Sequence, residues 1–248
     1  MGKSLQKQEN SSSNAHSHGH GHGGHGHSHG GHGGGKWELD WDAWDRRPEL
    51  IESAENMATF VGNNCDVLPD GTVLDFGCGS GLLLRQLLSR KMLSKAVGAD
   101  VEEGMLKVLR SRIEEEGLKG KVKVVLMNAT DGSDVKALGT FDLVTCVYVL
   151  GHIRDVEVDA ALDNICSAVK PGGFALIAEF DDISKQHEGN SKEDKFISDG
   201  GHAHTSVSLE RLESAFSRNS LVVVKAEKIN LTLFNSSTVA NVVAAKRE

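Results

Sequence analysis

Residues 73–81 read Val73-Leu74-Asp75-Phe76-Gly77-Cys78-Gly79-Ser80-Gly81, an apolar run that passes directly into three alternating glycines. The apolar part is typical of a buried strand. The glycines allow a tight turn that brings the backbone close to a ligand, and the amides of a following helix suit a negative group. The stretch therefore predicts a ligand-binding turn between a strand and a helix of an α/β domain.

Two residues near this turn argue against a dinucleotide as the ligand. A dinucleotide-binding fingerprint requires glycine at position 82, where this chain has Leu82. Asp75 would repel a pyrophosphate, whereas it would attract the ammonium of an amino-acid cofactor directly or through water. The glycine spacing taken alone also fits a plain tight turn.

On both sides of this turn, short β-branched runs alternate with amphipathic stretches, which is typical of a parallel sheet with helices on both faces. We expect an α/β fold with a doubly wound, mostly parallel seven-stranded sheet, of Rossmann-like type. The strands are expected at 72–76, 96–99, 122–127, 141–147, 174–180, 221–229 and 239–245, and the helices at 49–61, 82–88, 102–116, 156–169 and 209–218.

Length and composition set further bounds. With 248 residues, of which 39% are hydrophobic, the chain can bury one substantial core but hardly two. Its 27 Lys and Arg against 35 Asp and Glu disfavour a broad nucleic-acid surface. The four cysteines form no Cys-x-x-Cys pair, so we expect reduced, mostly buried thiols. Without a long apolar run or a secretory-signal pattern, we expect a cytoplasmic protein, without excluding the nucleus.

The composition changes sharply near Lys36. Residues 11–35 are almost wholly Ser, His and Gly, so we expect 1–36 to be a disordered tail and 37–248 the folded domain. Neutral imidazoles on such a tail can bind zinc, nickel or copper, either as a function or only incidentally. The histidines concerned are His16, His18, His20, His22, His25, His27, His29 and His32.

Asp75 with the glycines at 77, 79 and 81 after an apolar strand resembles the first motif of class I S-adenosylmethionine-dependent methyltransferases. The resemblance continues through 97–100, 125–131 and 141–147 to the Lys-Pro-Gly-Gly turn at 170–173, and it covers about residues 45–246. It is strongest to small-molecule methyltransferases of the ubiquinone-biosynthesis type. It implies S-adenosyl-L-methionine as the cofactor.

The resemblance also implies which residues bind this cofactor. Asp100 stands where the family's carboxylate accepts both ribose hydroxyls, although it could also cap the helix after it. Met105 would lie against the adenine or pack in the core. Asn128 replaces the usual Asp that contacts the adenine amino group; its amide oxygen can accept that bond, and Asp131 could substitute. The full implied set is Asp75, Gly77, Cys78, Gly79, Gly81, Asp100, Val101, Met105, Asn128, Ala129 and Val147.

Two histidines are candidate catalytic residues. His152 follows the 141–147 strand, where relatives often carry a histidine, and an imidazole there can accept a proton from a hydroxyl or amine. A backbone hydrogen bond or a cofactor contact are its alternative roles. His204, beside His202 in the Gly-rich loop 199–204, could face the substrate or simply be exposed.

These features predict methyl transfer to an O or N nucleophile of an unidentified small-molecule acceptor. The chain lacks both an Asn-Pro-Pro-aromatic motif after the fourth strand and a Pro-Cys nucleophile motif, which disfavours DNA-base and glutamine methylation. The alternatives are a protein methyltransferase, a non-catalytic S-adenosylmethionine-binding protein, or a metal-handling protein. The oligomeric state is left open.

Two segments are candidates for closing over the acceptor. Residues 37–45 hold all three tryptophans, and residues 181–207 form an unusually long polar connection. We expect both to become ordered when cofactor and acceptor bind. In the alternative interpretation, the tryptophans only pack the first helix onto the sheet.

Overall fold

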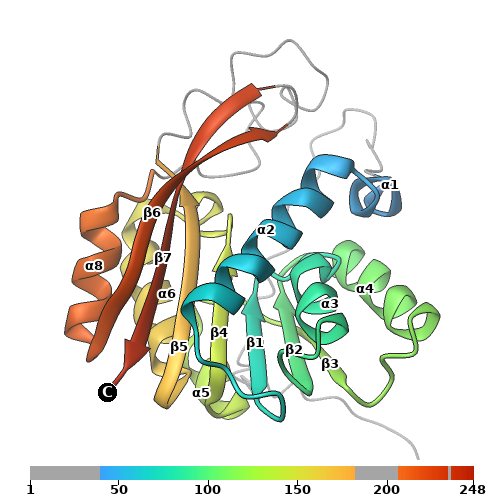
Figure 1. Ribbon diagram of the computed structural model, residues 1–248, viewed down its shortest axis with the longest axis horizontal. Coiled ribbons are helices and arrows are strands. Elements are labelled where there is room, and N and C mark those ends of the chain that lie inside the picture. The colour runs from blue at the N-terminus through green and yellow to red at the C-terminus, as the bar shows by residue number, and fades with distance from the viewer. Residues whose placement is uncertain (1–39, 182–205, 234–235) are drawn as a thin grey trace, which may run out of the picture. The chain divides into compact units, whose positions relative to one another are not determined.

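The computed structural model of the protein describes residues 40–181, 206–233 and 236–248 (Figure 1). Within these ranges the strands are β1 Thr72–Phe76, β2 Lys95–Asp100, β3 Val122–Leu126, β4 Phe141–Val147, β5 Val169–Phe180, β6 Leu221–Leu233 and β7 Ser236–Arg247. They form one seven-stranded sheet in the order β3-β2-β1-β4-β5-β7-β6. Strands β1 to β5 are parallel, whereas β7 runs antiparallel to both β5 and β6. The predicted fold class is confirmed.

Helices cover both faces of this sheet (Figure 1). In the described residues they are α1 Trp41–Asp45, α2 Pro48–Asn64, α3 Leu82–Ser89, α4 Glu103–Glu115, α5 Gly132–Leu138, α6 Asp155–Ser167 and α8 Leu209–Arg218, with a short 3-10 helix, η1, at Leu150–His152. Buried side chains of α2, α3 and α4 form a core on one face, and those of α5, α6 and α8 form a core on the other. None of these helices is long and apolar enough to span a membrane.

The alternation of side chains along the central strands explains this two-sided core. In β1, Val73 belongs to the core under α2 to α4, whereas Leu74 belongs to the core under α5, α6 and α8. Leu143 and Val144 of the adjacent strand β4 divide in the same way. Consecutive strand residues point to opposite faces, so a strand covered on both sides must be apolar throughout.

Several elements differ from the sequence-based expectation. The short helices α1 and α5 were not predicted, because each buries only one residue, Asp45 and Val135 respectively. Strand β5 begins at Val169, five residues early, because Val169 pairs with Phe141 before the register shifts. Strands β6 and β7 continue pairing as far as Leu233 and Ser236, which extends both beyond the expected ends.

Candidate active site

The glycine turn after β1 has a backbone that only glycine adopts without strain. Gly77, Gly79 and Gly81 have φ values of 64°, 53° and 79°, all in the left-handed region. A Cβ on Gly77 would lie 2.2 Å from a methyl of Val149, and one on Gly81 would lie 2.4 Å from a methyl of Leu109. A Cβ on Gly79 would meet nothing nearer than the Met105 sulfur at 3.9 Å. The turn is therefore packed at both ends and has open space at its centre.

Asp100, the last residue of β2, fixes this turn from the neighbouring strand. The amide of Gly79 donates to Asp100 Oδ2 at 2.8 Å, and the amide of Glu102 donates to Oδ1 at 2.9 Å. Burial raises the pKa of the Asp100 carboxyl, while these amide hydrogen bonds oppose the rise. Asp100 is not the cap of α4, because Glu102 holds that position and accepts from the amide of Gly104.

Asp75 lies below the turn as a buried carboxyl group. It is 3% exposed, and the Thr145 hydroxyl donates to its Oδ1 at 2.6 Å. Burial raises its pKa to about 7, more than the hydrogen bond from Thr145 lowers it. Asp75 also lines a cavity in which no described lining residue carries a positive charge. A cationic ligand group would therefore find an unpaired carboxyl group there.

This cavity, which we call the turn cavity, has a volume of about 140 Å³. It lies between α1 and α2 on one side and the glycine turn, α3, α4 and the end of β4 on the other. Its lining residues are Trp44, Leu50, Ser53, Ala54, Met57, Asp75, Gly77, Cys78, Gly79, Ser80, Leu82, Leu83, Met105, Val147 and Tyr148. Six of the predicted cofactor-binding residues are among them: Asp75, Gly77, Cys78, Gly79, Met105 and Val147.

The remaining predicted cofactor-binding residues do not line the turn cavity. Gly81 is the N-cap of α3, and Val101 directly follows β2 and is 65% exposed. Asn128 is exposed, and its Oδ1 accepts from the amide of Thr130 at 3.0 Å. Ala129 is buried, and its carbonyl accepts from Asn164. The structure thus places Asp100, Val101 and Asn128 at or just beyond the carboxyl ends of β2 and β3.

Asp131 has a structural role. Its Oδ1 accepts from the amide and the hydroxyl of Ser133, at 3.0 and 2.7 Å, and caps α5. These hydrogen bonds lower the pKa of Asp131. The carboxylate is therefore already committed to a helix N-terminus.

Two site residues were not found from the sequence. Tyr148 follows β4 with φ at 57°, and its ring stacks on Phe180 with centroids 4.5 Å apart. Glu179 is 1% exposed and accepts the amides of Gly151 and Phe180 at 3.0 and 2.9 Å. Burial raises the pKa of Glu179 to about 7. An acidic residue inside the apolar run 174–180 was the one sequence signal for this carboxyl group.

Known proteins resemble this chain in sequence and in fold. Residues 73–173 match a family model described as a methyltransferase domain. This match supports a place among the class I S-adenosylmethionine-dependent methyltransferases. The sequence resemblance is thereby confirmed.

Individual methyltransferase relatives cover only part of the chain. A ubiquinone/menaquinone biosynthesis C-methyltransferase of Hydrogenovibrio crunogenus is 33% identical over 124 residues, which are 48% of this chain and 46% of that protein. A ubiquinone biosynthesis O-methyltransferase of Idiomarina loihiensis is 32% identical over 114 residues, 46% of this chain and 44% of that protein. The chain thus spans about half the length of these curated relatives.

A solved methyltransferase structure has the same fold over most of the chain. Magnesium protoporphyrin IX methyltransferase from Synechocystis, crystallised with S-adenosylhomocysteine, aligns with a TM-score of 0.59 and 16% identity. The alignment covers 86% of this chain and 90% of that one.

Of the two predicted catalytic histidines, His152 is within the described residues, and it does not line the turn cavity. His152 is in η1, its side chain is exposed, and its amide donates to the carbonyl of Val149 at 3.0 Å. His204 lies outside the described residues, as do His202 and the tail histidines. Within the described part of the chain, no group of His, Cys, Asp or Glu is arranged to hold a metal ion.

The predicted closing segments are described only in part. Residues 41–45 of the first segment form α1, in which Trp44 lines the turn cavity. Residues 182–205, most of the second segment, lie outside the described residues.

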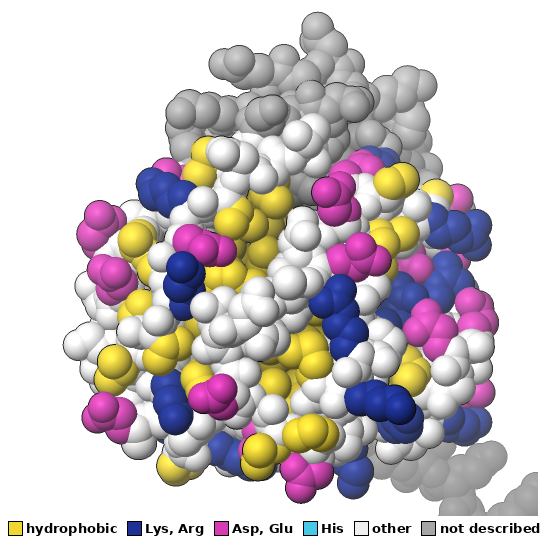
Figure 2. Space-filling model, viewed as in Figure 1, with side chains coloured by type: hydrophobic (Ala, Val, Ile, Leu, Met, Phe, Trp, Pro, Cys, Tyr) yellow, Lys and Arg dark blue, Asp and Glu magenta, His cyan; other side chains and the backbone are white. Residues whose placement is uncertain are grey.

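The four cysteines, Cys65, Cys78, Cys146 and Cys166, are all buried and free. Burial is the main cause that raises the pKa of each thiol. Cys78 lines the turn cavity and is therefore expected there as a neutral thiol, not a nucleophile. On the face shown in Figure 2, basic and acidic side chains are interspersed and do not form separate patches.

Proposed function

We propose that the protein transfers a methyl group from S-adenosyl-L-methionine to an O or N nucleophile of a small-molecule acceptor. The observation that carries the proposal is the buried Asp75 carboxyl group beneath a glycine turn with open space at its centre. It faces a cavity whose described lining residues carry no positive charge. The match to the methyltransferase family model supports the reaction. The names of the curated relatives refer to the biosynthesis of small molecules, ubiquinone and menaquinone, which supports the acceptor class.

The described residues fit this cofactor. Asp75 would hold the ammonium of its amino-acid part, and Asp100 would accept the ribose hydroxyls. Val101 and Met105 offer apolar surface to the adenine. Asn128 Oδ1 already accepts one hydrogen bond from Thr130, and a carbonyl oxygen can accept a second one from the adenine amino group.

The turn cavity is too small for the whole cofactor. Its volume of about 140 Å³ lies below the ~300–1,000 Å³ of ordinary ligand pockets. The cavity therefore suits the amino-acid part, and the adenosine would lie along the open strand ends near Asp100 and Val101.

The protein itself needs to supply little chemistry. When bound, S-adenosylmethionine supplies a methyl group that its sulfonium makes electrophilic. The chain's own residues would align the acceptor with the methyl group and exclude water. Such alignment can lower the activation barrier substantially. We propose His152, just beyond β4, or His204 as the group that takes a proton from the acceptor. A cytoplasmic location is part of the same proposal.

The test combines calorimetry with a transfer assay. Binding of S-adenosylmethionine is measured by titration, and labelled methyl transfer is then followed into the small-molecule and protein fractions of a cell extract. Label in small molecules supports the proposal, whereas label in protein indicates a protein methyltransferase. Binding without transfer indicates a non-catalytic binding protein. Metal binding without cofactor binding indicates a metal-handling protein.

A further inference from the structure

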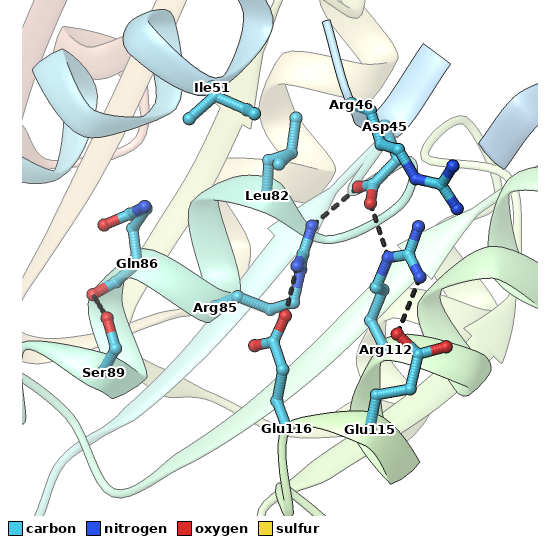
Figure 3. A pocket seen from close by; sticks show the side chains of 10 residues that line it. All are labelled: Asp45, Arg46, Ile51, Leu82, Arg85, Gln86, Ser89, Arg112, Glu115 and Glu116. Atoms are coloured by element: carbon cyan, nitrogen blue, oxygen red, sulfur yellow. Dashed lines mark hydrogen bonds and ion pairs between the residues drawn. The ribbon is translucent and has the colours of Figure 1, made fainter. Parts of the chain in front are cut away.

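A buried ion-pair cluster joins the short helix α1 to α3 and α4 (Figure 3). Asp45 of α1 is 4% exposed and accepts from two arginines, Arg85 Nη2 of α3 and Arg112 Nε of α4, each at 2.6 Å. Arg85 also pairs with Glu116, just beyond α4, and Arg112 also pairs with Glu115 of α4 and with the more exposed Asp42 of α1. Asp45 is thus the single carboxylate that both arginines share, as Figure 3 shows.

Two tryptophans of α1 lie near the proposed cofactor site. Trp44, directly before Asp45, lines the turn cavity together with Met105 and the glycine turn. Trp41 lies against the start of α4, because a Cβ on Gly104 would be only 2.2 Å from its indole nitrogen. One turn of helix therefore carries both the buried carboxylate and two tryptophans beside the predicted cofactor site.

Helix α1 cannot hold this position by itself. A helix of five residues is far below the length that is stable in isolation, so tertiary contacts must fix it. Asp45 is the one residue of α1 that is buried. Its two charge-assisted hydrogen bonds are of the strong kind, and removing its charge would leave two largely buried guanidinium groups without their shared partner.

We propose that Arg85 and Arg112 are positioning residues for the cofactor: through Asp45 they fix α1 and so hold Trp44 in the wall of the turn cavity. This inference rests on the proposed function, because it takes the turn cavity as part of the cofactor site. Without the shared carboxylate, the pair between Asp42 and Arg112 remains, but α1 loses its buried anchor. The wall of the cavity at Trp44 then loosens, and the bound cofactor dissociates faster.

A double-mutant cycle on S-adenosylhomocysteine affinity tests the inference, with calorimetry as the readout. We expect Asp45→Asn to weaken binding by about tenfold, the loss of roughly one charged hydrogen bond. If Asp45 acts through Trp44, the same change in a Trp44→Ala background costs almost nothing further, because coupled residues are not additive. An equal loss in both backgrounds, or no loss in either, overturns the inference.

Two further variants complete the design. Asp163→Asn breaks an Arg–Asp pair between α6 and α8, where Arg218 donates to Asp163 at 2.9 Å, and Asp163 does not line the cavity. We expect it to leave the affinity unchanged. If Asp45→Asn does not fold, Arg112→Lys replaces it in the same cycle, since lysine keeps the charge but loses the planar fork.

One measurement separates this inference from the proposed function. In a Trp37→Phe, Trp41→Phe background, Trp44 is the remaining tryptophan. Asp45→Asn should make the Trp44 indole more accessible to quenching by acrylamide when no ligand is present. Unchanged quenching overturns the positioning role. Wild-type protein that does not bind S-adenosylhomocysteine overturns the proposed function, whatever the quenching result.

Discussion

Asp100 has two roles to satisfy with one carboxylate. It already accepts the amides of Gly79 and Glu102, and the proposed function adds the ribose hydroxyls. We predict that Asp100→Ala weakens S-adenosylhomocysteine binding tenfold or more, because charged hydrogen bonds of ~1.5–3 kcal/mol each are lost. Calorimetric titration measures this loss. Asp100→Asn, which keeps one acceptor oxygen, should lose less, and unchanged affinity in Asp100→Ala would refute the ribose assignment.

Asp75 makes both stability and binding depend on pH. Its pKa is about 7 in the folded protein, against ~3.9 in an unfolded chain. Between these values the folded state keeps a proton that the unfolded state has lost. The contribution to stability is therefore fully present below about pH 4 and is lost as the pH rises through about 7. Asp75→Asn should flatten the dependence of unfolding free energy on pH across that range.

The same carboxyl group should release a proton on ligand binding. An ammonium beside Asp75 favours its ionised form, so binding of S-adenosylhomocysteine near pH 6 should expel up to one proton. Titrations in buffers of different ionisation enthalpy measure this number. Asp75→Asn serves as the control and should release none, and equal values for both proteins would exclude Asp75 as the ammonium partner.

At the scale of single residues, the sequence predicted the residues of the glycine turn, and the structure adds the interactions that fix them in place. The positive φ values of the three glycines follow from local sequence. By contrast, the hydrogen bond from Gly79 to Asp100 joins residues 21 apart in the chain. Glu179 and Tyr148 were missed for a similar reason: their partners are brought together only when β4 and β5 pair.

Strands β4 and β5 are linked at their carboxyl ends by Glu179. Its carboxyl oxygens accept amides from the loop after β4 and from its own strand end. We predict that Glu179→Gln lowers the unfolding free energy by ~1–3 kcal/mol, because the new amide NH₂ faces buried donors. Denaturant unfolding at pH 8 gives this value. Glu157→Gln is a control that should change little, because the half-buried Glu157 near the start of α6 pairs only with the exposed Arg154 among the described residues.

Long elements were predictable because their apolar periodicity extends over many residues. Helix α4, with Leu106, Leu109 and Ile113 buried, was expected almost to its observed ends. Helices α1 and α5 have no such pattern. α1 is fixed by Asp45 and its distant arginine partners, which are 40 and 67 residues away along the chain. No local sequence pattern predicts contacts at that separation.

At the scale of the whole molecule, the two-sided core follows from the apolar composition of the strands. The boundary between the N-terminal tail and the folded domain rests on composition alone. The described residues begin at Asp40, close to the composition change at Lys36. The division into a tail, residues 1–36, and a folded domain, 37–248, stays a prediction. So does metal binding by the tail, because its histidines lie outside the described residues.

Deleting residues 1–35 tests both predictions together. The deleted segment contributes almost no apolar side chains, so we expect the melting temperature and the S-adenosylhomocysteine affinity to stay nearly unchanged. The deletion removes eight of the twelve histidines, so most nickel or zinc binding, measured by titration with the metal alone, should disappear.

A full-length variant with those eight histidines changed to serine separates the effect of the imidazoles from the effect of the length of the tail. It should lose metal binding to the same extent while keeping cofactor affinity. Loss of cofactor affinity or aggregation on deletion would mean that the tail is part of the working protein, and metal binding retained by both variants would place the metal site among the other four histidines.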